Sequence, residues 1–311
     1  MMDRREKFLC IALVVVGLIL SLVAPSFFQP QPLLSLAASR VPALLAVIGT
    51  VLVILTRQID ISIGSTIGIT AVVIGHLNAS GLPMLLAAVV GAVIASALGA
   101  VNGCLVAFLR LPSIVVTLAT LVVGAEALRL TQRGQFVPLK ADAQWFGLTQ
   151  TTGQLVLVLS TVGLLVAGDF VLRNLRAARA FYAVGSNAES ARLSGISPTA
   201  TTFTAFTLNG LAAGLAAACS VVQSPQVDPK CGIGMEMTTI AAAVVGGVSI
   251  NGGTGGLRGA ALGLVLLSVV NPALTHLHVD AYWEKAIQGA VILLSVLSES
   301  RRTKLRPPSN A

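Results

Sequence analysis

The chain has 311 residues, of which 55% are hydrophobic and only 10% are charged. Soluble domains carry about 25% charged residues, so this composition excludes an ordinary water-facing surface. Apolar runs recur at lengths near the ~20 residues that span a bilayer, without the alternation of a membrane β-barrel. The net charge of +8 comes from residues between or beside these runs, which argues against nucleic-acid binding. We therefore expect one all-α, polytopic membrane domain over residues 1–311.

The apolar runs predict about ten transmembrane helices. They cover residues 8–24, 41–56, 61–78, 82–108, 113–130, 153–172, 200–222, 238–250, 257–272 and 285–298. With the N-terminus in the cytoplasm and one crossing per run, fourteen of the 20 Lys and Arg residues lie on the cytoplasmic side. This bias favours both termini inside.

Two regions depart from simple spans. The run 238–250 is too short to cross alone, which is typical of a buried or re-entrant segment. Residues 87–103 and 252–263 are rich in small side chains, which let helices approach closely in lipid. Residues 41–77 and 238–272 each hold two apolar runs joined by a polar hinge, and such interrupted segments often mark the centre of a transporter.

The stretch "LTRQIDISIGS" (55–65) places Arg57 and Asp60 between two apolar runs. The topology puts it at the cytoplasmic end of a helical hairpin, where charge is tolerable. We favour a structural turn in which Asp60 caps the next helix and Arg57 pairs with Asp60 or with lipid phosphate. The alternative is a proton-coupled secondary transporter with Asp60 or Glu126 as the proton carrier.

Other polar residues in the apolar runs have structural and functional interpretations. Glu126 has Arg129 three residues on, and Asp169 has Arg173 four residues on, so both carboxylates have a helical partner. Asn102, Asn209 and Asn271 can be satisfied by neighbouring helices, and they are also candidates to line the path of a sugar-like solute.

Residues 173–199 form the longest predicted cytoplasmic connection. Ser186 and Glu189 fit a capping box, which predicts a helix beginning near Asn187. Gly195 and Pro198 then end it after about two turns. An isolated helix this short is marginal in water, so it needs either its own membrane domain or a partner protein to pack on.

Four motifs resemble the permease subunits of bacterial ABC importers, in the ribose-type monosaccharide branch. "FYAVGSNAESARLSGI" (181–196) resembles the cytoplasmic coupling motif of that family. "QIDISIGS" (58–65), "LPSIVVTLATL" (111–121) and "GGVSINGGTGGLRGAALG" (246–263) resemble its other blocks in the same order. The family commonly has Gly-Gly before Ile-Asp, whereas Arg57-Gln58 stands here, and this stretch resembles that of the autoinducer-2 importer permeases.

The resemblance implies a multi-pass protein of the bacterial inner membrane that moves a sugar-like solute inward by alternating access. The implied partners are cytoplasmic ATP-binding subunits, a second permease subunit (identical or homologous) and an extracytoplasmic solute-binding protein. The chain has no Gly-Lys dipeptide and hence no phosphate-binding loop, so we expect ATP hydrolysis in a partner and no cofactor or catalytic residue here. No metal-ligand spacing is present either. The implied coupling residues are Gly185, Ser186, Asn187, Glu189, Ala191, Arg192 and Gly195.

Overall fold

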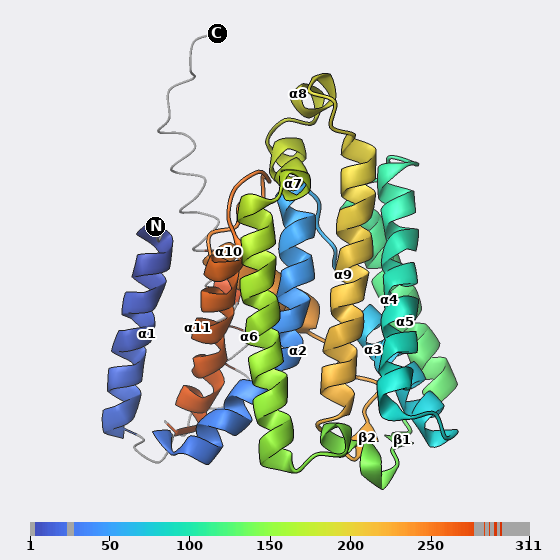
Figure 1. The fold of residues 1–311 in the computed structure, drawn as a ribbon, viewed down its shortest axis with the longest axis vertical. Helices are drawn as coiled ribbons and strands as arrows, with labels where there is room; N and C mark the ends of the chain where they lie inside the picture. Colours follow the sequence, from blue (N-terminus) through green and yellow to red (C-terminus); the bar gives the residue numbers. More distant parts are fainter. Residues whose placement is uncertain are drawn as a thin grey trace.

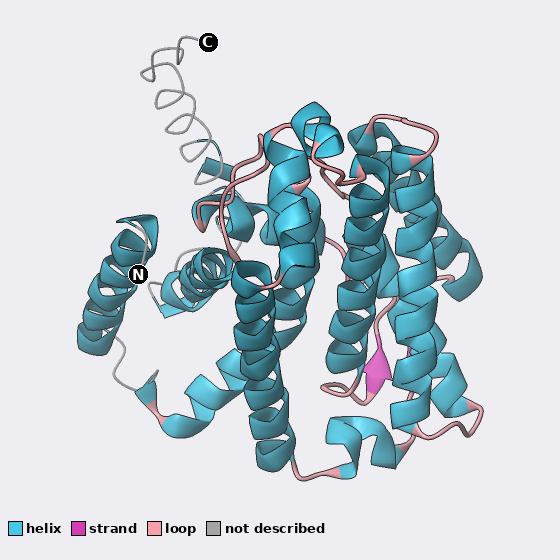
Figure 2. Cartoon of the chain, turned by 45° about the horizontal axis from the view of Figure 1, so that its top comes forward, coloured by secondary structure: helices cyan, strands magenta, loops and turns pink. Residues whose placement is uncertain are grey.

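The computed structural model describes residues 4–23 and 28–276, with isolated positions between 283 and 293. Its elements are almost all helical (Figure 2). They are α1 (Arg4–Val23), α2 (Pro30–Leu55), α3 (Ile63–Ala79), α4 (Met84–Ala107), α5 (Ser113–Gln132), β1 (Val137–Pro138), a 3₁₀ segment (Ala141–Gly147), α6 (Gln150–Asn174), α7 (Arg176–Ser186), α8 (Ala188–Leu193), α9 (Pro198–Val221), β2 (Gln226–Val227), α10 (Met235–Val245) and α11 (Leu257–His276). The predicted segment 285–298 falls mostly outside the described residues.

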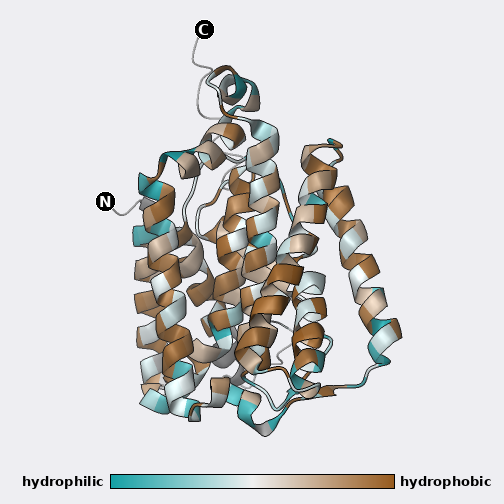
Figure 3. Ribbon diagram, turned by 45° about the vertical axis from the view of Figure 1, so that its right-hand side comes forward, coloured by the Kyte–Doolittle hydropathy of each residue, from teal (hydrophilic) through white to brown (hydrophobic). Residues whose placement is uncertain are grey.

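Five of the described helices (α2, α4, α5, α6 and α9) are long and apolar enough to cross a membrane. They run side by side along the long axis, with α8 beyond one end and the β1–β2 pair at the other (Figure 1). We call these the α8 end and the β end. The most hydrophobic window of α2 is 78% buried, whereas those of α5 and α6 are only 17% and 22% buried. The apolar outer faces of α5 and α6 therefore fit contact with lipid or with another subunit (Figure 3).

Helices α3 and α10 are too short to span the bundle. With 17 and 11 residues, they extend about 25 Å and 17 Å at 1.5 Å per residue. They begin beside one another, because the backbones of Gly64 and Gly232 are in close contact. From this level α3 runs to the β end, and α10 runs toward the α8 end. The run expected at 238–250 therefore overlaps a short helix, as its length predicts.

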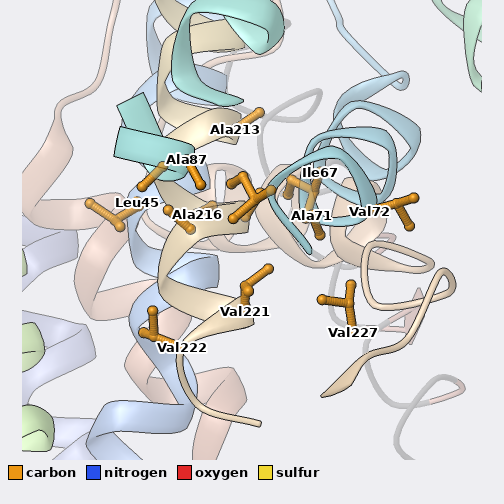
Figure 4. Packing of buried hydrophobic residues seen from close by; sticks show 14 of the residues in the cluster. Leu45, Ile67, Ala71, Val72, Ala87, Ala213, Ala216, Val221, Val222 and Val227 are labelled. Atoms are coloured by element: carbon orange, nitrogen blue, oxygen red, sulfur yellow. The ribbon is translucent and has the colours of Figure 1, made fainter. Parts of the chain in front are cut away.

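Small residues bring the central helices together. A Cβ on Gly99 of α4 would lie 2.9 Å from the Cα of Gly210 of α9, and one on Gly214 would lie 2.6 Å from the Cα of Ala92. In lipid the hydrophobic effect does not drive helices together, so their association depends on close packing. These contacts confirm the packing role expected for residues 87–103. Around them lies a core of mostly small and β-branched side chains (Figure 4).

Candidate functional site

Helix α8 is short but has complete caps at both ends. The Asn187 side chain accepts a hydrogen bond from the Ser190 amide at 2.9 Å. At the other end, the Gly195 amide donates to the Arg192 carbonyl and the Ile196 amide donates to the Ala191 carbonyl, both at 3.0 Å. These two bonds form a Schellman motif, and Gly195 has the positive φ of +80° that the motif requires. The predicted stop at Gly195 is confirmed.

The predicted capping box at Ser186 and Glu189 is wrong. Ser186 is the last residue of α7, a helix that sequence reasoning missed. Asn187 has extended backbone angles and caps α8 instead. Glu189 forms an ion pair with Arg192 at 2.6 Å, and both side chains are exposed. A capping box needs a non-helical residue at Ser186, and the preceding helix removes that possibility.

Residues at the end of α7 pack directly on the membrane domain. A Cβ on Gly185 would collide with the Leu55 carbonyl at the end of α2. The same carbonyl accepts a hydrogen bond from the Gly253 amide at 3.0 Å. Tyr182 donates to the Gly255 carbonyl at 3.1 Å, and burial raises the pKa of its hydroxyl, which therefore keeps its proton. These contacts of Tyr182 and Gly185 connect α7 to α2 and to the loop 246–256.

Part of the surface of α8 is exposed and makes no contact with the rest of the described chain. Ala191 is buried, whereas Leu193 is 80% exposed. A six-residue helix held by its caps and one buried alanine thus presents an apolar side chain and an ion pair beyond the bundle (Figure 1).

The turn 56–62 does not lie at an exposed end of a hairpin. Arg57 adopts a positive φ of +63°, which reverses the chain after α2. The Ile59 amide then donates to the Ser113 hydroxyl at 3.3 Å on α5. Asp60 is only 4% exposed, so the expectation that its charge sits at a tolerant membrane face is wrong. Among the described residues Arg57 makes no ion pair with Asp60.

Hydrogen-bond donors surround the Asp60 carboxylate. It accepts from the Ser62 amide at 2.8 Å, from the Ser62 hydroxyl at 2.6 Å and from the Asn209 side chain at 2.9 Å. Asn102 in turn donates to the Ser62 hydroxyl at 2.8 Å. Asp60, Asn102 and Asn209 therefore form one buried cluster that joins α3, α4 and α9. Ser62, not Asp60, is the N-cap residue of α3.

The remaining expected residues lie apart from this cluster. Asn271 is in α11, but its side chain lies outside the described residues. Glu126 pairs with Arg129 at 2.6 Å on the surface of α5. Asp169 is buried between Arg173 at 2.8 Å and Arg258 at 2.7 Å, so the expected pair at Asp169 is confirmed and extended.

A cavity of about 940 Å³ lies between α5 and the segment 228–236, over the first turn of α3. It includes Glu126 but none of the other expected residues. Its lining is Gly64, Ser65, Leu121, Val122, Ala125, Glu126, Leu128, Arg129, Arg133, Gly134, Phe136, Asp228, Pro229, Lys230, Gly232, Ile233 and Glu236. The cavity extends from the end of α5, near the β end, to the level at which α3 and α10 begin.

Sequence reasoning missed Glu236, which lies at the inner end of this cavity. Its Oε1 accepts from the Gly234 amide at 3.1 Å, which caps α10. Its Oε2 is buried without a hydrogen-bond partner among the described residues. In the sequence, Glu236 is only an acid that follows "GIGM" (232–235). The fold is needed to show that α10 begins at this point, beside the start of α3.

In the part of the chain that the structure describes, no three His, Cys, Asp or Glu side chains gather as a metal site would require.

Five long apolar helices and a cavity lined by both polar and apolar side chains are typical of a membrane transport protein. The chain belongs to the family described as "branched-chain amino acid transport system / permease component", which it matches over residues 32–296. It is a multi-pass permease of the bacterial inner membrane.

Named relatives match nearly the whole chain. The autoinducer 2 import system permease protein LsrC of Klebsiella pneumoniae is 36% identical over 309 residues, covering 97% of this chain and 88% of the relative. The protein of the same name from Enterobacter sp. strain 638 is 35% identical, over 97% of this chain and 88% of the relative. The one from Photorhabdus luminescens is 32% identical, over 96% of this chain and 91% of the relative. No solved structure matches the chain.

Proposed function

We propose that this chain forms the transmembrane path of an ATP-driven importer for a sugar-like solute of the autoinducer-2 class. The observation that supports it most is the near-complete match to permeases of autoinducer 2 import systems. The family description mentions branched-chain amino acids, but the full-length relatives favour the sugar-like solute.

In this proposal the single domain has about ten crossings, with both termini and the α8 end in the cytoplasm. The cytoplasmic partners are two ATP-binding subunits. A second permease subunit completes the path, and a solute-binding protein delivers solute at the β end. The exposed apolar faces of α5 and α6 offer surfaces for lipid and for the second subunit.

Helix α8 then serves as the element that receives movement from the ATPase. Glu189, Arg192 and Leu193 lie on the surface, where a partner can contact them. The packing of Gly185 on Leu55 and Gly253 carries displacement of α7 and α8 into α2 and into the loop before α11. Such coupling requires contacts that differ between the inward-facing and outward-facing states.

The rival is a proton-coupled transporter with Asp60 or Glu126 as the carrier. Reconstitution with the ATP-binding and solute-binding partners distinguishes the two, using vesicles that contain ATP or carry only a proton gradient. We expect autoinducer 2 to enter only with ATP, and entry to persist with an uncoupler. Entry driven by the gradient without ATP would establish the rival.

A further inference from the structure

The inner end of the cavity lies where two short helices begin. The first backbone amides of a helix lack acceptors within it, and they carry the positive end of the helix dipole. The backbone contact between Gly64 and Gly232 brings the starts of α3 and α10 together. In many transporters, interrupted helices meet in this way at the solute site.

Glu236 places a carboxylate at this junction. Oε1 is held by the Gly234 amide, which fixes the side chain at the start of α10. Oε2 packs against Gly64, where an added Cβ would collide with it. This oxygen has no hydrogen-bond partner among the described residues, although buried polar atoms are nearly always paired. When Oε2 turns toward a donor in the cavity, it therefore loses no hydrogen bond, but only its van der Waals contact with Gly64.

The rest of the cavity suits a neutral solute with many hydroxyl groups. Its charged residues are three acids and three bases, so its formal charges cancel: Glu126, Asp228, Glu236, Arg129, Arg133 and Lys230. An anion site would carry an excess of bases. Apolar side chains such as Leu121, Val122 and Ile233 offer surface for the carbon skeleton of a sugar. Sites of this kind fix orientation with a few placed polar groups on an apolar lining.

We propose that the Glu236 carboxylate binds a hydroxyl group of the sugar-like solute at the inner end of this cavity. In the occupied state Oε2 leaves Gly64 and accepts a hydrogen bond from the solute hydroxyl, while Oε1 keeps its bond to the Gly234 amide. This assignment rests on the proposed function, because it takes the cavity as part of the import path.

The test compares the wild-type transporter with Glu236→Gln, reconstituted with its partner subunits in vesicles. Autoinducer 2 and L-leucine are the two probes, and uptake and ATP hydrolysis are both measured per assembled complex. A hydrogen bond to a charged group is worth enough that its loss should lower autoinducer 2 uptake by about tenfold or more. ATP hydrolysis should stay near the wild-type level. The control Asp142→Asn changes an exposed carboxylate outside the cavity, and should leave both rates unchanged.

The alternative outcomes separate the two proposals. If wild type imports autoinducer 2 and Glu236→Gln equals it, the import function stands and the role of Glu236 is refuted. A parallel fall in uptake and ATP hydrolysis would assign Glu236 to capping α10, which also refutes binding. Import of leucine in place of autoinducer 2 rejects the hydroxyl assignment but keeps an ATP-driven importer. If neither probe enters with ATP, both proposals fail.

Discussion

Asp60 is a buried carboxylate that meets hydrogen-bond donors and, among the described residues, no cation. Three donated bonds offset part of the cost of removing its charge from water. The bonds reach across the fold, since Asn209 lies on α9 and Ser62 begins α3. These bonds support a structural role for Asp60, in which it fixes the direction of α3 within the bundle.

Asp60→Asn should destabilise the permease by about 1–3 kcal/mol, because an amide replaces one acceptor oxygen with a donor. Whichever way the amide turns, its NH₂ group faces a donor on Ser62 or Asn209. The melting temperature in detergent and the amount of permease in the membrane should both fall. A proton carrier predicts the reverse pattern, with normal melting and no transport.

The exchange variant Asp60→Asn/Asn209→Asp gives a matched control. The new amide can donate to the new carboxylate, while its oxygen still accepts from Ser62. We expect the double variant to melt higher than either single variant, since partners in one network do not act additively. Additive losses would show that Asp60 and Asn209 are not coupled in this way.

At the scale of the element, α8 allows a paired proline test. Ala191→Pro removes the amide that donates to the Asn187 carbonyl at 3.0 Å and adds a ring clash, which costs about 3 kcal/mol in a helix. Ala188→Pro places proline at the first helical position, where its missing amide has no helical acceptor and the extended backbone of Asn187 is compatible.

We expect Ala191→Pro to abolish ATP-driven uptake with the permease still in the membrane, and Ala188→Pro to retain uptake. Quantitative membrane blots and uptake of autoinducer 2 measure the two properties separately. Normal uptake by the Ala191→Pro variant would refute the coupling role of α8.

Local signals explain why α8 was predicted and parts of the site were not. Gly195 and the polar stretch before it are near one another in sequence, so they indicate a helix end without the fold. The burial of Asp60 depends on Asn102 and Asn209, which lie far away along the chain. Glu236 gains its position only when residues 228–236 return along α3. Long-range packing of this kind leaves no periodic pattern in one sequence.

At the scale of the whole molecule, the charge distribution assigns an orientation that can be measured. Arg57 and Arg110 follow helices that end at the α8 end, and Arg176, Arg179 and Arg192 lie within α7 and α8 there. In contrast, Arg133, Lys140 and Lys230 lie toward the β end. Cationic residues are retained in the cytoplasm, so the α8 end should be inside.

Single cysteines at the two ends test this orientation. In a variant whose four native cysteines are replaced by alanine, Lys140→Cys and Leu193→Cys each add a thiol at an exposed position. A maleimide that does not cross the inner membrane should label Lys140→Cys in spheroplasts and label Leu193→Cys only after lysis. The melting temperature of each variant in detergent confirms that the labelled protein is folded. The opposite labelling would invert the topology, and would place α8 where a cytoplasmic ATPase cannot reach it.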